Sequence, residues 1–331
     1  MKKYSHLTII ERESLAYGLI QGRSLSDIAK SMGRDKSTLC REVSRSMQRE
    51  TTYSALTGQY FAKLHKEATG RKKKIDASLE LKGYIHKHLR LRWSPEQIAK
   101  RLRIEYPHDK NMQVSHEAIY TYLYVLPRGG LRAELLLYLR QKQRSRRKRT
   151  KAHTNRGQIP DLISIEERPE EVADRTIPGH WEGDLVMGKG RQSALGTLVE
   201  RTTRTTILVP LIKKDAQAVR RAFARETKKL PQQMKLSLTY DRGTEMSQHR
   251  LFTKQTKIKV YFAHPQSPWE RGTNENTNGL IRQYFPKGTN FHGITRKQIK
   301  KVQDLLNSRP RKVLDFQTPY EVFSTIVALE T

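Results

Sequence analysis

The sequence contains a single cysteine, Cys40, among its 331 residues. One thiol excludes an intramolecular disulfide and leaves no second thiolate for a cysteine-based zinc module. No run of 18 or more apolar residues occurs, so no transmembrane helix is predicted. The first residues are basic and are followed by charged residues where a signal peptide would have an apolar segment. We therefore expect a cytoplasmic protein with no membrane partner.

Acidic residues are also scarce, with 33 Asp and Glu against 64 Lys and Arg, for a formal net charge of +31. Residues 1–150 hold 33 basic and 14 acidic side chains, and residues 201–300 hold 21 and 6. Residues 151–200 reverse the balance, with 6 basic and 9 acidic side chains. The excess could serve only as a solubilising surface, but such clustering is more simply explained by contacts with phosphate groups. A polyanion is the expected partner.

The first 70 residues are predicted to form a helix-turn-helix domain. Capping patterns at Thr8 and Ser24 open helices that end near residues 21 and 32, and a third helix is expected over residues 36–46. A third helix of this kind reads the major groove of DNA, and the alternative is a three-helix bundle whose basic face is merely solvated. The expected DNA-contacting residues of this helix are Lys36, Ser37, Thr38, Arg41 and Arg45.

A second helix-turn-helix domain is predicted over residues 71–150, with helices near residues 77–90, 95–104 and from residue 116. His116 and Thr121 are expected to face outward and contact DNA. Seven of the ten residues 140–149 are Lys or Arg, and this run, with Arg146 and Arg147, is expected to act as an arm on the phosphate backbone. Residues 151–175 have the composition of a linker.

From Gly179 the pattern changes to short β-branched and apolar runs that alternate with helical segments. Asp184 and Asp241 lie at strand positions, and Glu275 lies in the first turns of a later helix. Three such carboxylates would form a cage for a hard divalent cation, which they need because adjacent negative charges repel. The residues alone leave two choices open: Glu182 shares a strand face with Asp184, and Glu270 would suit a helix N-terminus.

Three motifs carry a resemblance to a known family: His180-Trp181-Glu182-Gly183-Asp184, Tyr240-Asp241-Arg242-Gly243 and the stretch Pro-Trp-Glu-Arg-Gly-Thr-Asn-Glu-Asn at residues 268–276. Together they resemble the DDE transposases of the IS-thirty insertion-sequence family, which also show 33 residues between the second and third acids. The resemblance implies that Asp184, Asp241 and Glu275 are the catalytic and metal-binding residues. It also implies a multidomain protein, with all-α helix-turn-helix domains followed by an α/β ribonuclease H-like (retroviral integrase-like) catalytic domain over residues 176–331.

The sequence is therefore interpreted as a transposase that binds the terminal inverted repeats of its element in double-stranded DNA. It would cleave at the element ends to expose 3′-hydroxyls and join them to another DNA strand. Mg²⁺ is the expected cofactor, with Mn²⁺ also supporting activity. The resemblance implies a homodimer or higher oligomer on DNA, and the protein would be associated with the bacterial nucleoid when bound.

Two rival functions are a sequence-specific repressor with an inactive integrase-like domain and a ribonuclease. A repressor would need only residues 1–150 and leaves the three acids unexplained, whereas a ribonuclease has little use for two helix-turn-helix domains. Asn278 and Arg282 share a helix face with Glu275 and are expected to contact DNA or orient the carboxylate. Trp269 is expected to be a buried anchor of its loop, with stacking on an unpaired base as the alternative.

Overall fold

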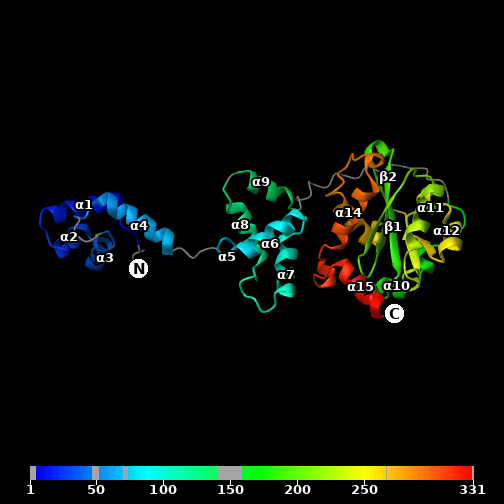
Figure 1. Ribbon diagram of the computed structural model, residues 1–331, viewed down its shortest axis with the longest axis horizontal. Helices are drawn as coiled ribbons and strands as arrows, with labels where there is room; N and C mark the ends of the chain where they lie inside the picture. The colour runs from blue at the N-terminus through cyan, green and yellow to red at the C-terminus, as the bar shows by residue number, and fades with distance from the viewer. Residues whose placement is uncertain are drawn as a thin grey trace. The chain divides into compact units, whose positions relative to one another are not determined.

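The computed structural model describes residues 5–46, 52–69, 74–127, 129–139, 159–265 and 267–329. Contacts divide the chain into two compact units, Met1–Ala77 and Ser78–Thr331. Figure 1 colours the chain from blue at the N-terminus to red at the C-terminus. Among the described helices, none combines the length and the apolar character needed to cross a bilayer.

The described part of the first unit consists of helices α1 (Ile9–Ile20), α2 (Leu25–Met32), α3 (Lys36–Ser46), α4 (Ala55–Thr69) and α5 (Lys74–Ala77). At the start of α1, Thr8 and Glu11 form a reciprocal capping box, and α2 ends at Gly33 with φ of 61°. Leu15, Ile28 and Leu39 are buried together between the first three helices. The three helices predicted for residues 9–46 are therefore confirmed.

Residues 78–139 of the second unit form α6 (Leu79–Arg90), α7 (Pro95–Glu105), α8 (His116–Val125) and α9 (Gly130–Leu137). Ser94 and Gln97 form a capping box at the start of α7, and Ser115 caps α8 by accepting a hydrogen bond from the Ala118 N–H. The helices expected near residues 77–90, 95–104 and from residue 116 are therefore confirmed. The basic run at residues 140–149, including Arg146 and Arg147, lies outside the described residues.

A five-stranded sheet follows within the described residues, in the spatial order β3-β2-β1-β4-β5. Its strands are β1 (His180–Met187), β2 (Ala194–Glu200), β3 (Thr206–Pro210), β4 (Ser237–Tyr240) and β5 (Lys259–Phe262). The first three strands pair antiparallel through short connections, whereas β4 pairs parallel with β1 and β5 pairs parallel with β4. Three strands in a meander followed by parallel strands after helical crossovers give the ribonuclease H-like arrangement that was expected.

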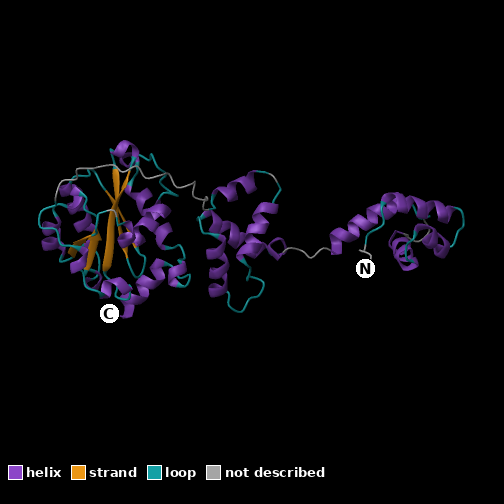
Figure 2. Cartoon of the chain, turned by 180° about the vertical axis from the view of Figure 1, so that it is seen from behind, coloured by secondary structure: helices purple, strands orange, loops and turns teal. Residues whose placement is uncertain are grey.

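Helices cover both faces of the sheet, as Figures 1 and 2 show. On one face lie α11 (Ala216–Thr227) and α12 (His249–Thr256), which bury Phe223 and Phe252 against the strands. On the other face lie α13 (Gly272–Ile281) and α14 (Arg296–Asn307), which bury Ile281 and Leu306. A sheet covered on both faces buries its central strands, and β2 is buried along its whole length.

Short elements complete the described chain: α10 (Glu171–Asp174), α15 (Pro319–Leu329) and the 3₁₀ turns η1 (Ile165–Glu167), η2 (Lys189–Arg191), η3 (Gln232–Met234), η4 (Thr244–Met246), η5 (Pro268–Arg271), η6 (Phe291–Gly293) and η7 (Lys312–Leu314). The helix that was expected to carry Glu275 in its first turns starts as the 3₁₀ turn η5 and becomes α-helical at Gly272.

Candidate active site

Asp184 lies on the central strand β1 and faces helix α13. Its Oδ1 accepts a hydrogen bond from the Leu185 N–H at 2.8 Å, and its Oδ2 accepts one from Asn278 Nδ2 at 2.7 Å. Burial raises the pKa of Asp184, Arg271 opposes that rise, and the nearby Asp241 adds to it. The carboxylate is therefore held in a fixed orientation, in surroundings where a cation would favour its ionised form.

Glu182, the competitor two positions earlier, is fully buried and serves as an attachment point for α13. Its Oε2 accepts a hydrogen bond from the Asn274 N–H at 2.8 Å, and its backbone carbonyl accepts one from Asn274 Nδ2 at 3.0 Å. Its Oε1 lies 3.3 Å from Nη1 of the buried Arg201. These contacts leave Glu182 without access to a substrate, and they make it part of the scaffold.

The register between β1 and α13 explains why both acids find a partner on the helix. Two residues along a strand advance the chain by about 6.6 Å, and four residues along a helix advance it by about 6 Å. Glu182 and Asp184 therefore match Asn274 and Asn278, which are separated by one turn. Asn278 orients the carboxylate, which was one of the two roles expected for it.

Asp241 directly follows β4, the strand that pairs in parallel with β1. The pairing joins Glu182 to Thr239, so two further steps along both strands bring Asp184 beside Asp241. Asp241 Oδ1 is buried and makes no hydrogen bond. A buried carboxylate oxygen without a donor is costly, which indicates that this atom has a partner in the working protein.

Arg271 lies between the two aspartates, a position that the sequence did not reveal. Its Nη2 is 3.5 Å from Asp241 Oδ2, its Nη1 is 3.7 Å from Asp184 Oδ1, and the same Nη1 donates to the Gly183 carbonyl at 3.0 Å. One guanidinium therefore contacts both acids and offsets part of their combined negative charge. Gly183 permits the close packing behind them, because a Cβ there would meet the Tyr240 ring at 2.7 Å.

Glu275 is exposed on the first turns of α13 and lines a pocket of about 210 Å³ with Asp184, Arg271, Asn274 and Asn278. Asp241 is not among the residues that line this pocket. Within the described ranges, no three His, Cys, Asp or Glu side chains lie close enough to hold one ion. The structure thus brings Asp184 and Asp241 together around Arg271 and sets Glu275 beside Asp184, without joining the three into one ligand cluster.

The loop before α13 accounts for the other competing acid. Glu270 accepts hydrogen bonds from the His264 N–H and Nδ1, both at 2.8 Å, and thereby closes the loop. Trp269 was expected to be buried, and this prediction is wrong: the side chain is 71% exposed. The indole lies in the 3₁₀ turn η5 and is exposed to solvent, while Glu270 provides the anchor that had been assigned to Trp269.

The expected DNA-contacting residues are distributed as follows. On α3, Lys36, Ser37, Arg41 and Arg45 are exposed, whereas Thr38 is half-buried. Arg41 Nη2 donates to Ser37 Oγ at 2.7 Å, and Arg45 pairs with Glu42 at 3.3 Å. On α8, His116 and Thr121 are exposed. Arg282 is half-buried, and its Nη2 donates to the Met187 carbonyl at 2.7 Å, which ties α13 to the end of β1.

Comparison with known proteins agrees with this architecture. The helix-turn-helix domain family matches residues 3–46, and the integrase core domain family matches residues 175–268. The chain is therefore a DNA-binding protein with the catalytic core of the integrases. The overlap with a solved structure, the catalytic core domain of BIV integrase, is limited to 46% of this chain and 97% of that chain, at 17% identity and a TM-score of 0.37.

Similarity to transposases extends over nearly the whole chain. The transposase of insertion sequence element IS1086 from Cupriavidus metallidurans is 40% identical over 99% of this chain and 97% of its own length. Transposase InsI of IS30A from Escherichia coli is 41% identical over 98% of this chain and 85% of its own, and the IS4351 transposase of Bacteroides fragilis is 37% identical over 97% and 96%. This chain belongs to the IS30 family of transposases.

Membership of this family implies the use of a divalent metal ion, and the residues present fit one. Asp184 and Asp241 supply carboxylate oxygens, the ligands that hard cations prefer, and the orphaned Asp241 Oδ1 lacks the partner that an ion would provide. The Arg271 guanidinium supplies positive charge between these two aspartates. Glu275 would be the third oxygen ligand, from the wall of the adjoining pocket.

Proposed function

We propose that this transposase binds the terminal inverted repeats of its element, nicks the DNA at the element ends to expose 3′-hydroxyls, and joins those hydroxyls to another DNA strand. Asp184, Asp241 and Glu275 are the proposed catalytic and metal-binding residues. The observation that carries the proposal is the pairing of Asp184 and Asp241 across adjacent parallel strands, around one cationic group and next to the pocket that Glu275 lines.

The chemistry is proposed as two in-line displacements at phosphorus. Water attacks the phosphorus first, and the bond between that phosphorus and the 3′ oxygen breaks to leave a 3′-hydroxyl. This hydroxyl then loses its proton as it attacks a phosphorus of the second strand, where the bond to the 3′ oxygen of that strand breaks and the leaving oxygen takes up a proton. Bound Mg²⁺, or Mn²⁺ in its place, would activate the attacking oxygen and stabilise the charge of the leaving one. The chain itself fixes the acids: Asn278 orients Asp184, the Glu182–Asn274 contacts fix the start of α13, and α13 presents Glu275.

Recognition of the repeat is assigned to residues 1–150, with the exposed basic side chains of α3 as one proposed reader of the major groove. The helix-turn-helix over residues 71–150 and the basic arm with Arg146 and Arg147 are proposed to add contacts to the phosphate backbone. We propose that at least two copies act together, because both element ends must be processed in one event.

The test uses linear DNA that carries the inverted repeat of the element, with Mg²⁺ and the full chain. Strand-specific nicks and joined products are expected from the wild type. Asp184→Asn, Asp241→Asn and Glu275→Gln, which keep side-chain shape, should each abolish both products and retain repeat binding. The matched control is Glu226→Gln on α11, where only surface ion pairs are lost. A wild type that binds the repeat in Mg²⁺ or Mn²⁺ and yields neither product would instead identify a repressor.

A further inference from the structure

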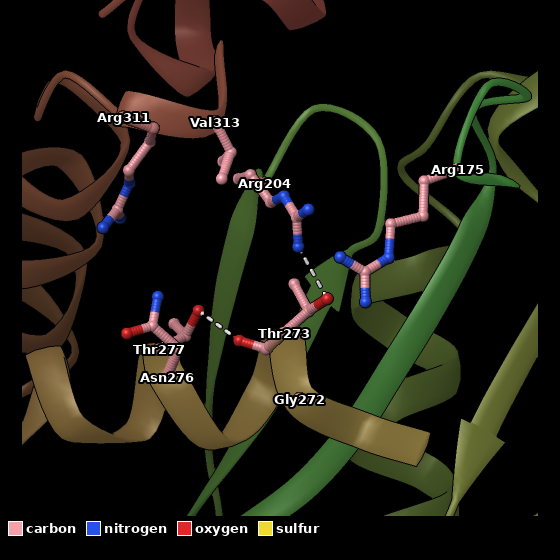
Figure 3. A pocket seen from close by; sticks show the side chains of 8 residues that line it. All are labelled: Arg175, Arg204, Gly272, Thr273, Asn276, Thr277, Arg311 and Val313. Atoms are coloured by element: carbon pink, nitrogen blue, oxygen red, sulfur yellow. Dashed lines mark hydrogen bonds between the residues drawn. The ribbon is translucent and has the colours of Figure 1, made fainter. Parts of the chain in front are cut away.

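A second cavity lies on α13, and three arginines line it. Arg175 follows α10, Arg204 lies between β2 and β3, and Arg311 precedes η7. Gly272, Thr273, Asn276 and Thr277 of α13 form the floor, with Val313 at the edge. Figure 3 shows the guanidinium groups of Arg175 and Arg204 turned toward Thr273, with Arg311 on the side of Thr277.

This cavity is distinct from the pocket of the acids, although both use the same helix. Glu275 and Asn278 line the pocket of the acids, whereas Thr273, Asn276 and Thr277 line the second cavity. Its volume of about 190 Å³ is several times the roughly 30 Å³ that one water molecule occupies in the liquid. The cavity can therefore hold a group much larger than one water molecule.

The charge in this cavity is unbalanced. None of the eight lining residues, all within the described ranges, is acidic. Burial lowers the pKa of Arg204, and Arg175 lowers it further, while the buried Glu182 and Glu200 offset part of that effect. Neighbouring guanidinium groups repel each other, so a negatively charged ligand would stabilise the arrangement.

Hydrogen-bonding groups in the cavity suit a tetrahedral anion. Arg204 Nη1 donates to Thr273 Oγ1 at 2.6 Å, which fixes the guanidinium against α13, and Arg204 Nε is buried without a hydrogen-bond partner. The Asn274 N–H in the first turn of α13 is already bound by Glu182 Oε2, so the charge that would attract an anion comes from the guanidinium groups and not from the helix N-terminus. Arginine groups held in this way bind phosphate through paired, charge-assisted hydrogen bonds.

We propose that this cavity, the arginine pocket, is a phosphate-binding subsite separate from the catalytic acids. Its ligand is a phosphate group, either of the DNA backbone or free in solution. The DNA source rests on the proposed function, because a strand that reaches Glu275 on one side of α13 passes the helix whose other side forms the arginine pocket.

The first arm of the test identifies a DNA phosphate. Duplexes of the inverted repeat are prepared in which one phosphate at a time is replaced by an uncharged methylphosphonate, and the Kd of the full chain is measured for each. For the wild type, several positions should weaken binding, and the one that faces the arginine pocket should do so roughly tenfold, since a charge-assisted hydrogen bond is lost there. Arg204→Gln should bind the unmodified duplex more weakly and show no further loss at that same position, whereas Arg204→Lys should keep part of the sensitivity.

Arg175→Asn is the second variant, and it guards against a folding defect in Arg204→Gln. Arg175 is exposed and has φ of 57°, a conformation that Asn tolerates better than most residues. The matched control is Arg225→Gln on α11, an exposed arginine on the opposite face of the sheet. Its methylphosphonate profile should be that of the wild type.

The second arm identifies a free anion. Inorganic phosphate is added to the full chain without DNA, and the Tm of the wild type is compared with that of Arg204→Gln and Arg175→Asn. A Tm increase confined to the wild type and the control, without a position-specific effect in the first arm, assigns the subsite to free phosphate.

Variants that match the wild type in both arms would overturn the proposal. Failure of the proposed function has a different signature, because the wild type would then neither nick nor join the repeat DNA, and the response to inorganic phosphate would still report on the arginine pocket.

Discussion

The buried Glu182 gives the sharpest prediction, because its contacts assign it a structural role, whereas Asp184 on the same strand has a proposed catalytic role. Glu182→Ala removes the counter-charge of Arg201, which is only 4% exposed, and the acceptor of the Asn274 N–H. Burial already lowers the pKa of Arg201 to about 10, so the charged form of this guanidinium is destabilised even with Glu182 present. Removal of one partner from a buried pair costs about 3–5 kcal/mol, a large share of the 5–15 kcal/mol that stabilises a typical domain.

The assay is urea unfolding followed by the fluorescence of Trp181, which is buried in the same domain with its Nε1 donating to the Met234 carbonyl at 2.8 Å. Trp93→Phe and Trp269→Phe in the background leave Trp181 as the sole tryptophan of the three. We expect Glu182→Ala to lose about 4 kcal/mol of unfolding free energy. A loss below about 1 kcal/mol would refute the account of Glu182 as a scaffold residue.

Two companion variants sharpen this result. Glu182→Gln keeps an acceptor for the Asn274 N–H but leaves Arg201 uncompensated, so it should fall between Glu182→Ala and the parent. Asp184→Asn should cost far less stability, because that side chain is 28% exposed, and yet abolish nicking. Glu182→Ala is also expected to be inactive, but through displacement of α13, and its lowered unfolding free energy distinguishes this cause from a catalytic one.

Three further predictions concern other parts of the chain. Trp269→Ala should leave the unfolding free energy nearly unchanged and weaken binding to single-stranded DNA by about 1–3 kcal/mol, because the indole is exposed, two residues before Arg271, and is free to stack on a base. Loss of stability without loss of affinity would contradict this. Burial lowers the pKa of His180 to about 4, below the ordinary 6.5, so the unfolded state binds more protons than the folded state between these pH values. The contribution of His180 to the free energy of unfolding should be complete above about pH 6.5 and should fall by on the order of 3 kcal/mol as the pH drops toward 4. His180→Asn should flatten this dependence in urea titrations at several pH values. Arg41→Ala on α3 should reduce discrimination between the inverted repeat and random DNA, measured as a ratio of Kd values, and an unchanged ratio would remove Arg41 from base recognition.

Local features of the fold were predictable because their causes lie within a few residues. The caps at Thr8, Ser24, Ser94 and Ser115 each accept a hydrogen bond from the backbone N–H three residues ahead, so the sequence shows both partners at once. The strands were recognisable from short β-branched runs, and the change in periodicity near Gly179 marked the start of the α/β core.

The choice between Glu182 and Asp184 could not be made from alternation, because both side chains face α13. The difference comes from residues far away in the sequence: Arg201 and Asn274 enclose Glu182, and Asn278 leaves part of Asp184 open. Trp269 was wrongly predicted to be buried for a related reason. A large aromatic in a loop is often an anchor, but here the Glu270–His264 hydrogen bonds close the loop and free the indole.

Helix α13 couples these features, and its position decides whether the site exists. Asn274 and Asn278 fasten it to β1 through Glu182 and Asp184, so a rotation of the helix would break both contacts together. The same rotation would carry Glu275 out of the pocket of the acids and Thr273 away from Arg204. Because a side chain on a helix surface moves with the backbone that carries it, Glu275 cannot be positioned independently of the arginine pocket. Occupancy of the arginine pocket by phosphate would therefore stabilise the position of Glu275, through contacts made by residues that do not line the pocket of the acids.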